Sequence, residues 1–284
     1  MQARTLNVMN LPFTVFVDTP RDGTVVELAS DGVENVLNDI DQRFSPFRPD
    51  SLVCRYRAGD RSMLDDDDDF TDVYSRSILA RTETDGLFDP FFRGGYDPTG
   101  LVKGWAVERA FGIALAPLIT QGSIAAAAIN AGGDMAMVPR TDGDPWHIGV
   151  VDPYDRRRYA ASFTLRSGAV ATSGTSERGE HVVRRSHDVV QATVIADSLV
   201  DADVWATALL AAPLRDVDRL VGEHELTAFL VLGPERFLVY SNGRRTKPVE
   251  HDGEVVAQRS AAVRGGKESA DDKESHDKRK EVLR

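Results

Sequence analysis

The stretch Ala125-Ala126-Ala127-Ala128-Ile129-Asn130-Ala131-Gly132-Gly133-Asp134-Met135-Ala136-Met137-Val138 joins two apolar segments through a tight glycine turn. The apolar segment 125–129 leads into the turn 130–134, and a strand is predicted over 135–138. The next predicted strand is 146–151, which the turn Asp152-Pro153 ends. Strands and turns therefore follow one another here without a helix between them.

Strands are also predicted on both sides of this stretch. Residues 8–17 alternate well enough for a strand, and Pro12 predicts that this strand lies at a sheet edge or a bulge. Towards the C-terminus, the predicted strands cover 161–165, 169–171 and 191–195, and a closing hairpin covers 227–232 and 237–240.

Helical spacing of apolar residues marks the segments between these strands. One predicted helix is led by the capping candidates Ser30 and Asp31 and contains Val33, Val36, Leu37, Ile40 and Phe44. Further helices are predicted near 70–81, 101–115 and 201–210. Because helices and strands interleave without a βαβ rhythm or a long internal repeat, the pattern predicts an α+β fold rather than a doubly wound parallel sheet.

Length and charge limit the possible functions. The 284 residues fit one large domain or two small ones, and an apolar content of 42% is ordinary for a globular protein. A net charge of −11 and a pI near 5.1 argue against a nucleic-acid partner, because most of the surface would repel a phosphate backbone.

Cysteine content and hydropathy exclude other classes. The single cysteine, Cys54, excludes an internal disulfide and any metal site built from several cysteines. No stretch approaches the roughly 18 apolar residues that a membrane span needs, and the start shows no secretory signal pattern. These patterns predict a cytoplasmic protein without a membrane span.

We expect one folded domain over residues 1–263 and a disordered tail over residues 264–284, which are mostly Lys, Asp, Glu, Ser and Gly. Within the domain, residues 65–69 are five consecutive aspartates. A calcium loop needs spaced ligands and a glycine turn. The run is therefore interpreted as a solvated loop that also places negative charge at a helix N-terminus.

The first candidate site lies on the predicted helix 201–210. Asp203 and Thr207 are four residues apart, so a carboxylate and a hydroxyl lie side by side on one helical face. Such oxygen donors suit Mg²⁺. The alternative is structural: Asp203 places charge near the helix N-terminus, and the Thr207 hydroxyl bonds a backbone carbonyl.

The second candidate is the segment Asp97-Pro98-Thr99-Gly100-Leu101-Val102-Lys103. Thr99 can cap a helix that begins at Gly100, and Lys103, one turn later, can reach an anion at that N-terminus. The alternative is a plain turn followed by a solvated lysine. Lys103 stands out because the other lysines all lie near or in the C-terminal tail.

Several familiar catalytic patterns are missing from the sequence. It contains neither a dinucleotide-binding G-x-G-x-x-G nor a Walker-type phosphate loop. Ser173 does not lie in a G-x-S-x-G elbow, and the histidines form no zinc-hydrolase pair. Serine-hydrolase and zinc-hydrolase chemistry are therefore disfavoured.

Taken in order, the motifs resemble the ApbE family, whose members are FAD:protein FMN transferases. The resemblance covers about residues 9 to 232. The segments that carry it are Val8-Met9, Phe44–Ser51, Thr84–Pro90, Asp97–Ala106, Asn130–Asp134, Trp146–Pro153, Ala171–Gly174, Thr193–Ile195 and Ala202–Thr207.

The resemblance implies a single α+β domain with a mixed, largely antiparallel sheet and packed helices. It implies that the chain binds FAD, uses Mg²⁺ and transfers FMN to a threonine or serine of an acceptor protein, releasing AMP. Acceptors of this family carry a motif similar to D-x-x-[ST]-G-[AS]-[ST]. The alternative is a relative that binds or hydrolyses FAD without modifying a protein.

The resemblance also assigns residues. Asp203, Thr207 and the backbone carbonyl of Gly100 match the metal ligands. The positions that match FAD contacts are Met9, Phe47, Leu87, Phe88, Asp89, Asp97 and Lys103.

Two segments depart from the family pattern. The usual Met-Gly-Thr is Met9-Asn10-Leu11 here. The family's His-Ile-x-Asp-Pro-x-Thr-Gly is replaced, after His181, by a stretch that contains Arg184-Arg185. His181 keeps the histidine position and is the candidate base or phosphate contact.

Overall fold

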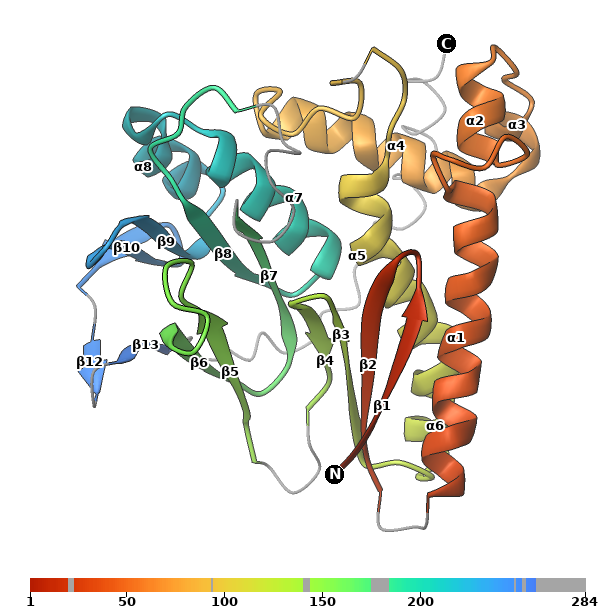
Figure 1. Cartoon of the computed structure of the whole chain (residues 1–284), viewed down its shortest axis with the longest axis horizontal. Helices are drawn as coiled ribbons and strands as arrows, with labels where there is room; N and C mark the ends of the chain where they lie inside the picture. Colours follow the sequence, from red (N-terminus) through yellow and green to blue (C-terminus); the bar gives the residue numbers. More distant parts are fainter. Residues whose placement is uncertain are drawn as a thin grey trace, which may run out of the picture.

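The computed structural model describes residues 1–19, 23–92, 94–139, 144–174, 184–247, 249–251 and 254–258. The predicted tail, 264–284, lies outside this range. Within it, the strands form one nine-stranded sheet and one four-stranded sheet (Figure 1). The α+β prediction is confirmed, and among the paired strands only β13 and β6 run parallel.

The large sheet is antiparallel throughout its described pairings. Its strands, in spatial order, are β1 (Gln2–Val8), β2 (Leu11–Asp18), β3 (Ala126–Ala131), β4 (Asp134–Met137), β7 (Gly168–Gly174), β8 (Gln191–Ala196), β9 (Thr227–Gly233), β10 (Arg236–Ser241) and β11 (Arg244–Thr246). The small sheet has the order β12 (Val249–His251), β13 (Glu254–Gln258), β6 (Tyr159–Leu165) and β5 (Trp146–Val151).

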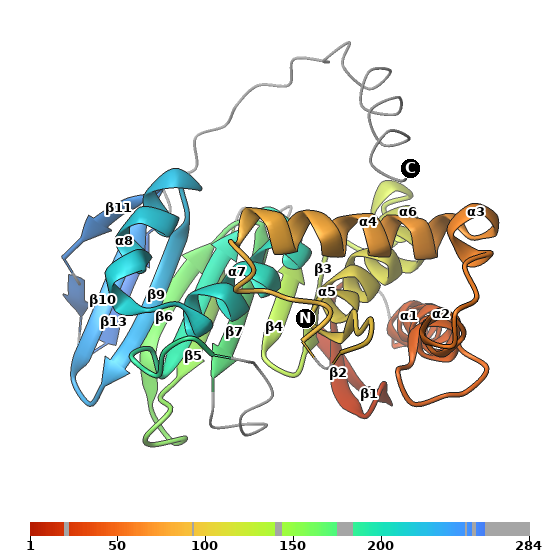
Figure 2. The same cartoon turned by 90° about the horizontal axis from the view of Figure 1, so that it is seen from above.

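The helices pack mainly on one face of the large sheet (Figure 2). They are α1 (Thr24–Phe44), α2 (Leu52–Arg57), α3 (Met63–Asp66), α4 (Asp68–Glu83), α5 (Thr99–Ala110), the π-helical turn η1 (Phe111–Leu115), α6 (Ala116–Thr120), α7 (Leu199–Ala211) and α8 (Leu214–Glu223). Helices α2, α3, α6 and α8 are additional to the predicted ones.

Strand β3 shows how the layers are built. Ala127, Ile129 and Ala131 belong to the core beneath the helices, whereas Ala126 and Ala128 belong to the core shared with the small sheet. Because successive side chains on a strand point to opposite faces, an all-apolar strand is what a sheet covered on both sides requires.

Two predicted boundaries are wrong. The predicted strand 8–17 is a hairpin of β1 and β2, because Met9 and Asn10 both adopt positive φ, 53° and 58°, and form its two-residue turn. Pro12 therefore lies near the start of β2, which is an inner strand rather than an edge. Helix α1 begins at Thr24, so Ser30 and Asp31 are interior residues, because Val26 and Ala29 extend its buried face.

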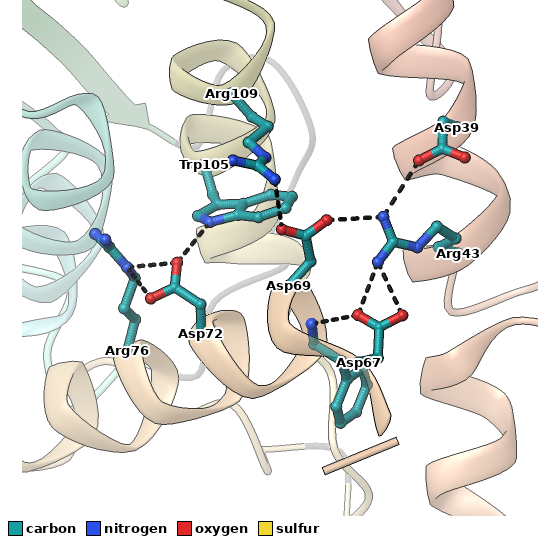
Figure 3. A network of polar contacts seen from close by, with 9 residues as sticks. Asp39, Arg43, Asp67, Asp69, Asp72, Arg76, Trp105 and Arg109 are labelled. Atoms are coloured by element: carbon teal, nitrogen blue, oxygen red, sulfur yellow. Dashed lines mark hydrogen bonds and ion pairs between the residues drawn. The ribbon is translucent and has the colours of Figure 1, made fainter. Parts of the chain in front are cut away.

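The aspartate run is partly buried in a network between helices (Figure 3). Asp67 caps α4 by accepting a hydrogen bond from Phe70 N at 2.9 Å, which confirms the charge predicted at a helix N-terminus. The prediction of a loop is wrong, because the run ends α3 and begins α4; Asp65, Asp66 and Asp68 are exposed as predicted. Arg43 of α1 binds the other two, Asp67 and Asp69, at 2.7 and 2.9 Å. Asp69 also pairs with Arg109 of α5 at 3.0 Å. The network therefore ties α1, α4 and α5 together.

Arg43 is the centre of this network. Burial lowers the pKa of its guanidinium, but hydrogen bonds to Asp67 and Asp69 outweigh burial, so the pKa of Arg43 is raised. The arginine is therefore charged at every relevant pH.

Replacing Arg43 tests this network. Arg43→Met is expected to lower the free energy of unfolding by about 1–3 kcal/mol, because Asp67 loses its arginine partner and Asp69 keeps only Arg109. The matched control is Arg76→Met, which removes an exposed pair with Asp72 and is expected to change stability by less than about 0.5 kcal/mol. Urea denaturation measures both variants, and equal losses of stability would show that the Arg43 network contributes no more than an exposed ion pair.

Helices α5 and α7 approach each other closely at Gly104. A Cβ built on Gly104 would lie 3.0 Å from the Leu199 carbonyl oxygen and 3.1 Å from Val200 N. Both are backbone atoms of α7, which cannot move aside as a flexible side chain can. Glu108, one turn further along α5, accepts hydrogen bonds from Leu199 N and Val200 N at 2.6 and 3.2 Å. Helix α5 thus caps and contacts the start of α7.

This close contact gives a second stability test. Gly104→Ala is expected to lower the free energy of unfolding by about 1–3 kcal/mol, because the added methyl group separates the helices. Gly112→Ala is the control, since nothing lies within 4 Å of its Cβ position, and it is expected to leave stability unchanged or raise it by up to about 1 kcal/mol. Thermal unfolding that ranks the two variants in the opposite order would refute the close-packing argument.

Candidate active site

A cavity of about 750 Å³ lies where the N-terminal part of α5 meets α7, β4, β7 and the loop 86–92. Its lining combines aromatic and apolar side chains with carboxylates, hydroxyls and Lys103. Its lining residues include Phe47, Leu87, Phe88, Asp89, Asp97, Gly100, Lys103, Asp134, Asp152, Ser173, Arg185, Asp203 and Thr207.

The start of α5 is fixed by Asp97. Its carboxylate accepts hydrogen bonds from the Thr99 backbone N at 3.2 Å and from the Thr99 hydroxyl, and it pairs with Arg57 at 3.3 Å. Asp97 is only 4% exposed, so these contacts compensate for its burial. The capping role predicted for Thr99 belongs to Asp97, because Thr99 is already the first helical residue.

The charged centre of the cavity contains Lys103, Asp134 and Asp203. Lys103 Nζ forms an ion pair with Asp134 Oδ2 and lies 3.3 Å from Asp203 Oδ2. The two aspartates are 1% and 4% exposed. The buried position of Asp203 follows from α7, whose residues are buried on nearly all sides between α5 and the sheet.

Strand β7 supports this centre through two consecutive residues. The Thr172 backbone N donates to Asp134 Oδ1 at 2.8 Å. The Ser173 hydroxyl lies 3.2 Å from the Thr207 hydroxyl, within hydrogen-bond distance. The end of β7 therefore positions polar groups from both β4 and α7.

The apolar and aromatic part of the lining includes the segment between α4 and α5. Phe88 N donates to the buried Thr84 hydroxyl at 3.0 Å, which holds the segment against the end of α4. Phe88 closely covers Gly100, since a Cβ there would lie 3.0 Å from Phe88 Cε2. Asp89 pairs with Arg81 at 3.1 Å, and Phe47 stands 77% exposed. A partly exposed aromatic wall of this kind suits a flat aromatic ligand.

The residues present fit a magnesium ion. Oxygen atoms are available from Asp203, Thr207, Ser173 and the Gly100 carbonyl. The charged centre has a net negative charge, because it contains two carboxylates and one ammonium group. In the described ranges, no cluster of three or more His, Cys, Asp or Glu has the spacing of a metal site. Mg²⁺ commonly uses one or two carboxylates and takes its other ligands from water and substrate phosphate, so this donor set is sufficient.

Nine of the eleven residues predicted for the site line this one cavity: Phe47, Leu87, Phe88, Asp89, Asp97, Gly100, Lys103, Asp203 and Thr207. Met9 lies in the β1–β2 turn and borders a different depression, beside Asn38 and Asp41 of α1. His181 falls outside the described residues. The individual roles of all eleven remain predictions.

Sequence reasoning missed Asp134 and Ser173 as parts of the site. Both lie in segments that carry the resemblance, Asn130–Asp134 and Ala171–Gly174, but neither was predicted to be a site residue. No local signal marked them, because glycine-containing turns occur wherever the chain reverses direction.

Part of the sequence matches a known protein family. Residues 95–231 match the ApbE family. The matched segment contains Asp97, Lys103, Asp134, Asp203 and Thr207, and thus the charged centre of the cavity. The resemblance read from the motifs is confirmed.

Two curated proteins are similar in sequence to part of this chain. The chain is 26% identical over 146 residues to the FAD:protein FMN transferase of Salmonella typhimurium, and 27% identical over 148 residues to that of Klebsiella pneumoniae. Each alignment covers 46% of this chain and 40% of the relative. The chain thus matches less than half the length of these curated relatives.

Solved structures share the fold over a longer range. The ApbE protein of Thermotoga maritima superposes with a TM-score of 0.69 at 20% identity, covering 84% of this chain and 97% of that one. The flavinyl transferase ApbE of Pseudomonas stutzeri, in its apo form, gives a TM-score of 0.68 at 21% identity, covering 85% and 94%. The chain therefore has the ApbE fold.

Proposed function

We propose that this chain transfers the FMN half of FAD to a threonine or serine hydroxyl of an acceptor protein, releases AMP and uses Mg²⁺. The observation that carries the proposal is the charged centre of the cavity, where Lys103 lies beside buried Asp203. Thr207 and the aromatic residues Phe47 and Phe88 line the same cavity. The matched relatives named FAD:protein FMN transferase support it.

The reaction breaks one P–O bond of the FAD pyrophosphate and forms one P–O bond to the acceptor oxygen. The acceptor hydroxyl loses its proton, and AMP leaves with the electrons of the broken bond. Negative charge therefore builds up on phosphate oxygens and must be stabilised in the transition state. When bound, Mg²⁺ would supply this stabilisation as a Lewis acid.

The chain's own residues have separate tasks in this proposal. Asp203, Thr207 and the Gly100 carbonyl hold the ion. Lys103 presents a positive charge towards the phosphates near the start of α5, where the helix dipole also favours an anion. Phe88 and Phe47 contact a ring of the flavin nucleotide. His181 is proposed to accept the acceptor's proton.

The acceptor is proposed to be a protein with a motif similar to D-x-x-[ST]-G-[AS]-[ST]. No helix among the described residues is long and apolar enough to span a bilayer. We also propose that the acceptor is a cytoplasmic protein.

Replacing Asp203 tests the proposed reaction. Asp203→Asn is expected to lower the Mg²⁺-dependent rate of FMN transfer by about 100-fold or more, because loss of a carboxylate ligand removes several kcal/mol of charge stabilisation. The control is Asp201→Asn on the same helix, which does not line the cavity and is expected to retain activity.

The measurement is the intact mass of an acceptor domain after incubation with the full chain, FAD and Mg²⁺. A wild-type rate of FMN transfer by Asp203→Asn would show that Asp203 is not a metal ligand. If the wild-type chain cleaves FAD while the mass of several different acceptor domains stays unchanged, the chain is a relative that hydrolyses FAD. This alternative is motivated by the segment around Arg184-Arg185, which replaces the family pattern.

A further inference from the structure

Asp134 is a buried carboxylate of the cavity that has no part in the proposed metal or FAD contacts. Its side chain is 2% exposed, and its two oxygens have different partners. Oδ1 accepts the Thr172 backbone N at 2.8 Å, and Oδ2 pairs with Lys103. The first contact fixes the carboxylate to the sheet, and the second directs it at the ammonium group.

The β3–β4 turn holds Asp134 in this place. Asp134 is the first residue of β4 and pairs with Ala131 across the hairpin. The Asn130 side chain accepts a hydrogen bond from Gly133 N at 2.8 Å inside the turn. The carboxylate thus stands on a rigid element of the sheet, whereas Lys103 reaches it through a flexible four-carbon stem.

Lys103 also lies 3.3 Å from Asp203 Oδ2, an oxygen of the carboxylate proposed to bind Mg²⁺. An ammonium group and a divalent cation compete for such an oxygen. In a site this buried, their competition is stronger than it would be in water. A second carboxylate that holds the lysine would reduce it.

We propose that Asp134 is a positioning residue that binds the Lys103 ammonium group and so leaves Asp203 available to the metal ion. The inference rests on the proposed function, because it takes Asp203 as a metal ligand. It assigns to the β3–β4 turn a role in metal affinity. Asp134 acts through Lys103 and needs no contact with the metal itself.

The inference predicts the effect of Asp134→Asn. The amide keeps the size of the side chain and can still accept the Thr172 N–H. It loses the charge that holds Lys103, so the ammonium group pairs more strongly with Asp203. Metal affinity is expected to fall about 10-fold or more, as it commonly does when a residue that orients a metal ligand is lost.

Loss of a nearby negative charge would weaken cation binding even without Lys103. A double-mutant cycle separates the two causes. If Asp134 acts through Lys103, Asp134→Asn changes metal affinity by less than about twofold in a chain that already carries Lys103→Met. If Asp134 acts only through its charge, the loss is the same in both backgrounds.

The experiment titrates the full chain without FAD with Mn²⁺, which shares the oxygen-ligand preference of Mg²⁺, and measures free Mn²⁺ by electron paramagnetic resonance. Displacement by Mg²⁺ shows that both ions use one site. Asp152→Asn is the control, because Asp152 also lines the cavity but its carboxylate accepts a hydrogen bond from Tyr154 N at 2.8 Å. The metal affinity of this variant is expected to stay within about twofold of wild type. Thermal unfolding shows that each variant is folded.

A large loss of affinity in Asp134→Asn that vanishes in the Lys103→Met background supports the inference. An equal loss in both backgrounds, or wild-type affinity in Asp134→Asn, overturns it while leaving the proposed transferase intact. Should Asp134→Asn fail to fold, Asp134→Glu takes its place in the cycle with the same criteria, because a longer side chain displaces the charge from Lys103. Absence of Mn²⁺ binding in the wild-type chain overturns both the metal site and the inference.

Discussion

The contact of α5 with α7 at Gly104 is the constraint on which the site depends. Because Gly104 has no side chain, the α5 backbone lies against Leu199 and Val200, and Glu108 caps the start of α7. Lys103 is the neighbour of Gly104, and Asp203 lies one turn beyond Leu199. The same close approach that packs the two helices therefore brings the ammonium and the carboxylate to 3.3 Å.

Burial then decides the chemistry of the charged centre. Two carboxylates in an apolar environment are costly unless partners compensate for the lost hydration. Lys103 and the Thr172 backbone N supply part of that compensation, and a metal ion with substrate phosphate would complete it. The aromatic side chains of the same cavity offer a surface for flat rings. A cavity with both kinds of lining suits a molecule that joins aromatic rings through phosphates.

Much of the fold could be predicted from local sequence. The strand 146–151 has its predicted bounds, and α7 extends the predicted helix by only a few residues, because both are strongly apolar segments with clear ends. The hairpin at Met9-Asn10 shifts the alternation by one residue, since Leu6 and Val8 are buried before the turn and Phe13, Val15 and Val17 after it. The prediction of one strand over 8–17 overlooked this shift. Ser30 looked like a cap because its residue type favours one, but tertiary packing of Val26 and Ala29 lengthens the helix.

The site was predictable in part for a similar reason. Asp203 and Thr207 share a helical face, so their spacing alone places them together. Asp134 and Ser173 join them only through the pairing of β4 with β7 and the packing of β7 on α7, which are contacts between distant segments. Glycine turns are common, and nothing in the short sequence Gly132-Gly133-Asp134 distinguishes a turn that supports a site from one that only reverses the chain.

The central claim is that one cavity binds FAD and a metal ion held by Asp203, Thr207 and the Gly100 carbonyl. Crystals of the full chain soaked with FAD and Mn²⁺ test it most directly, because anomalous scattering locates the ion. The account predicts an anomalous peak within coordination distance of Asp203, Thr207 and the Gly100 carbonyl, FAD phosphates on the same ion, and Lys103 still paired with Asp134. An ion or FAD bound outside this cavity, with Asp203 still paired to Lys103, would contradict it.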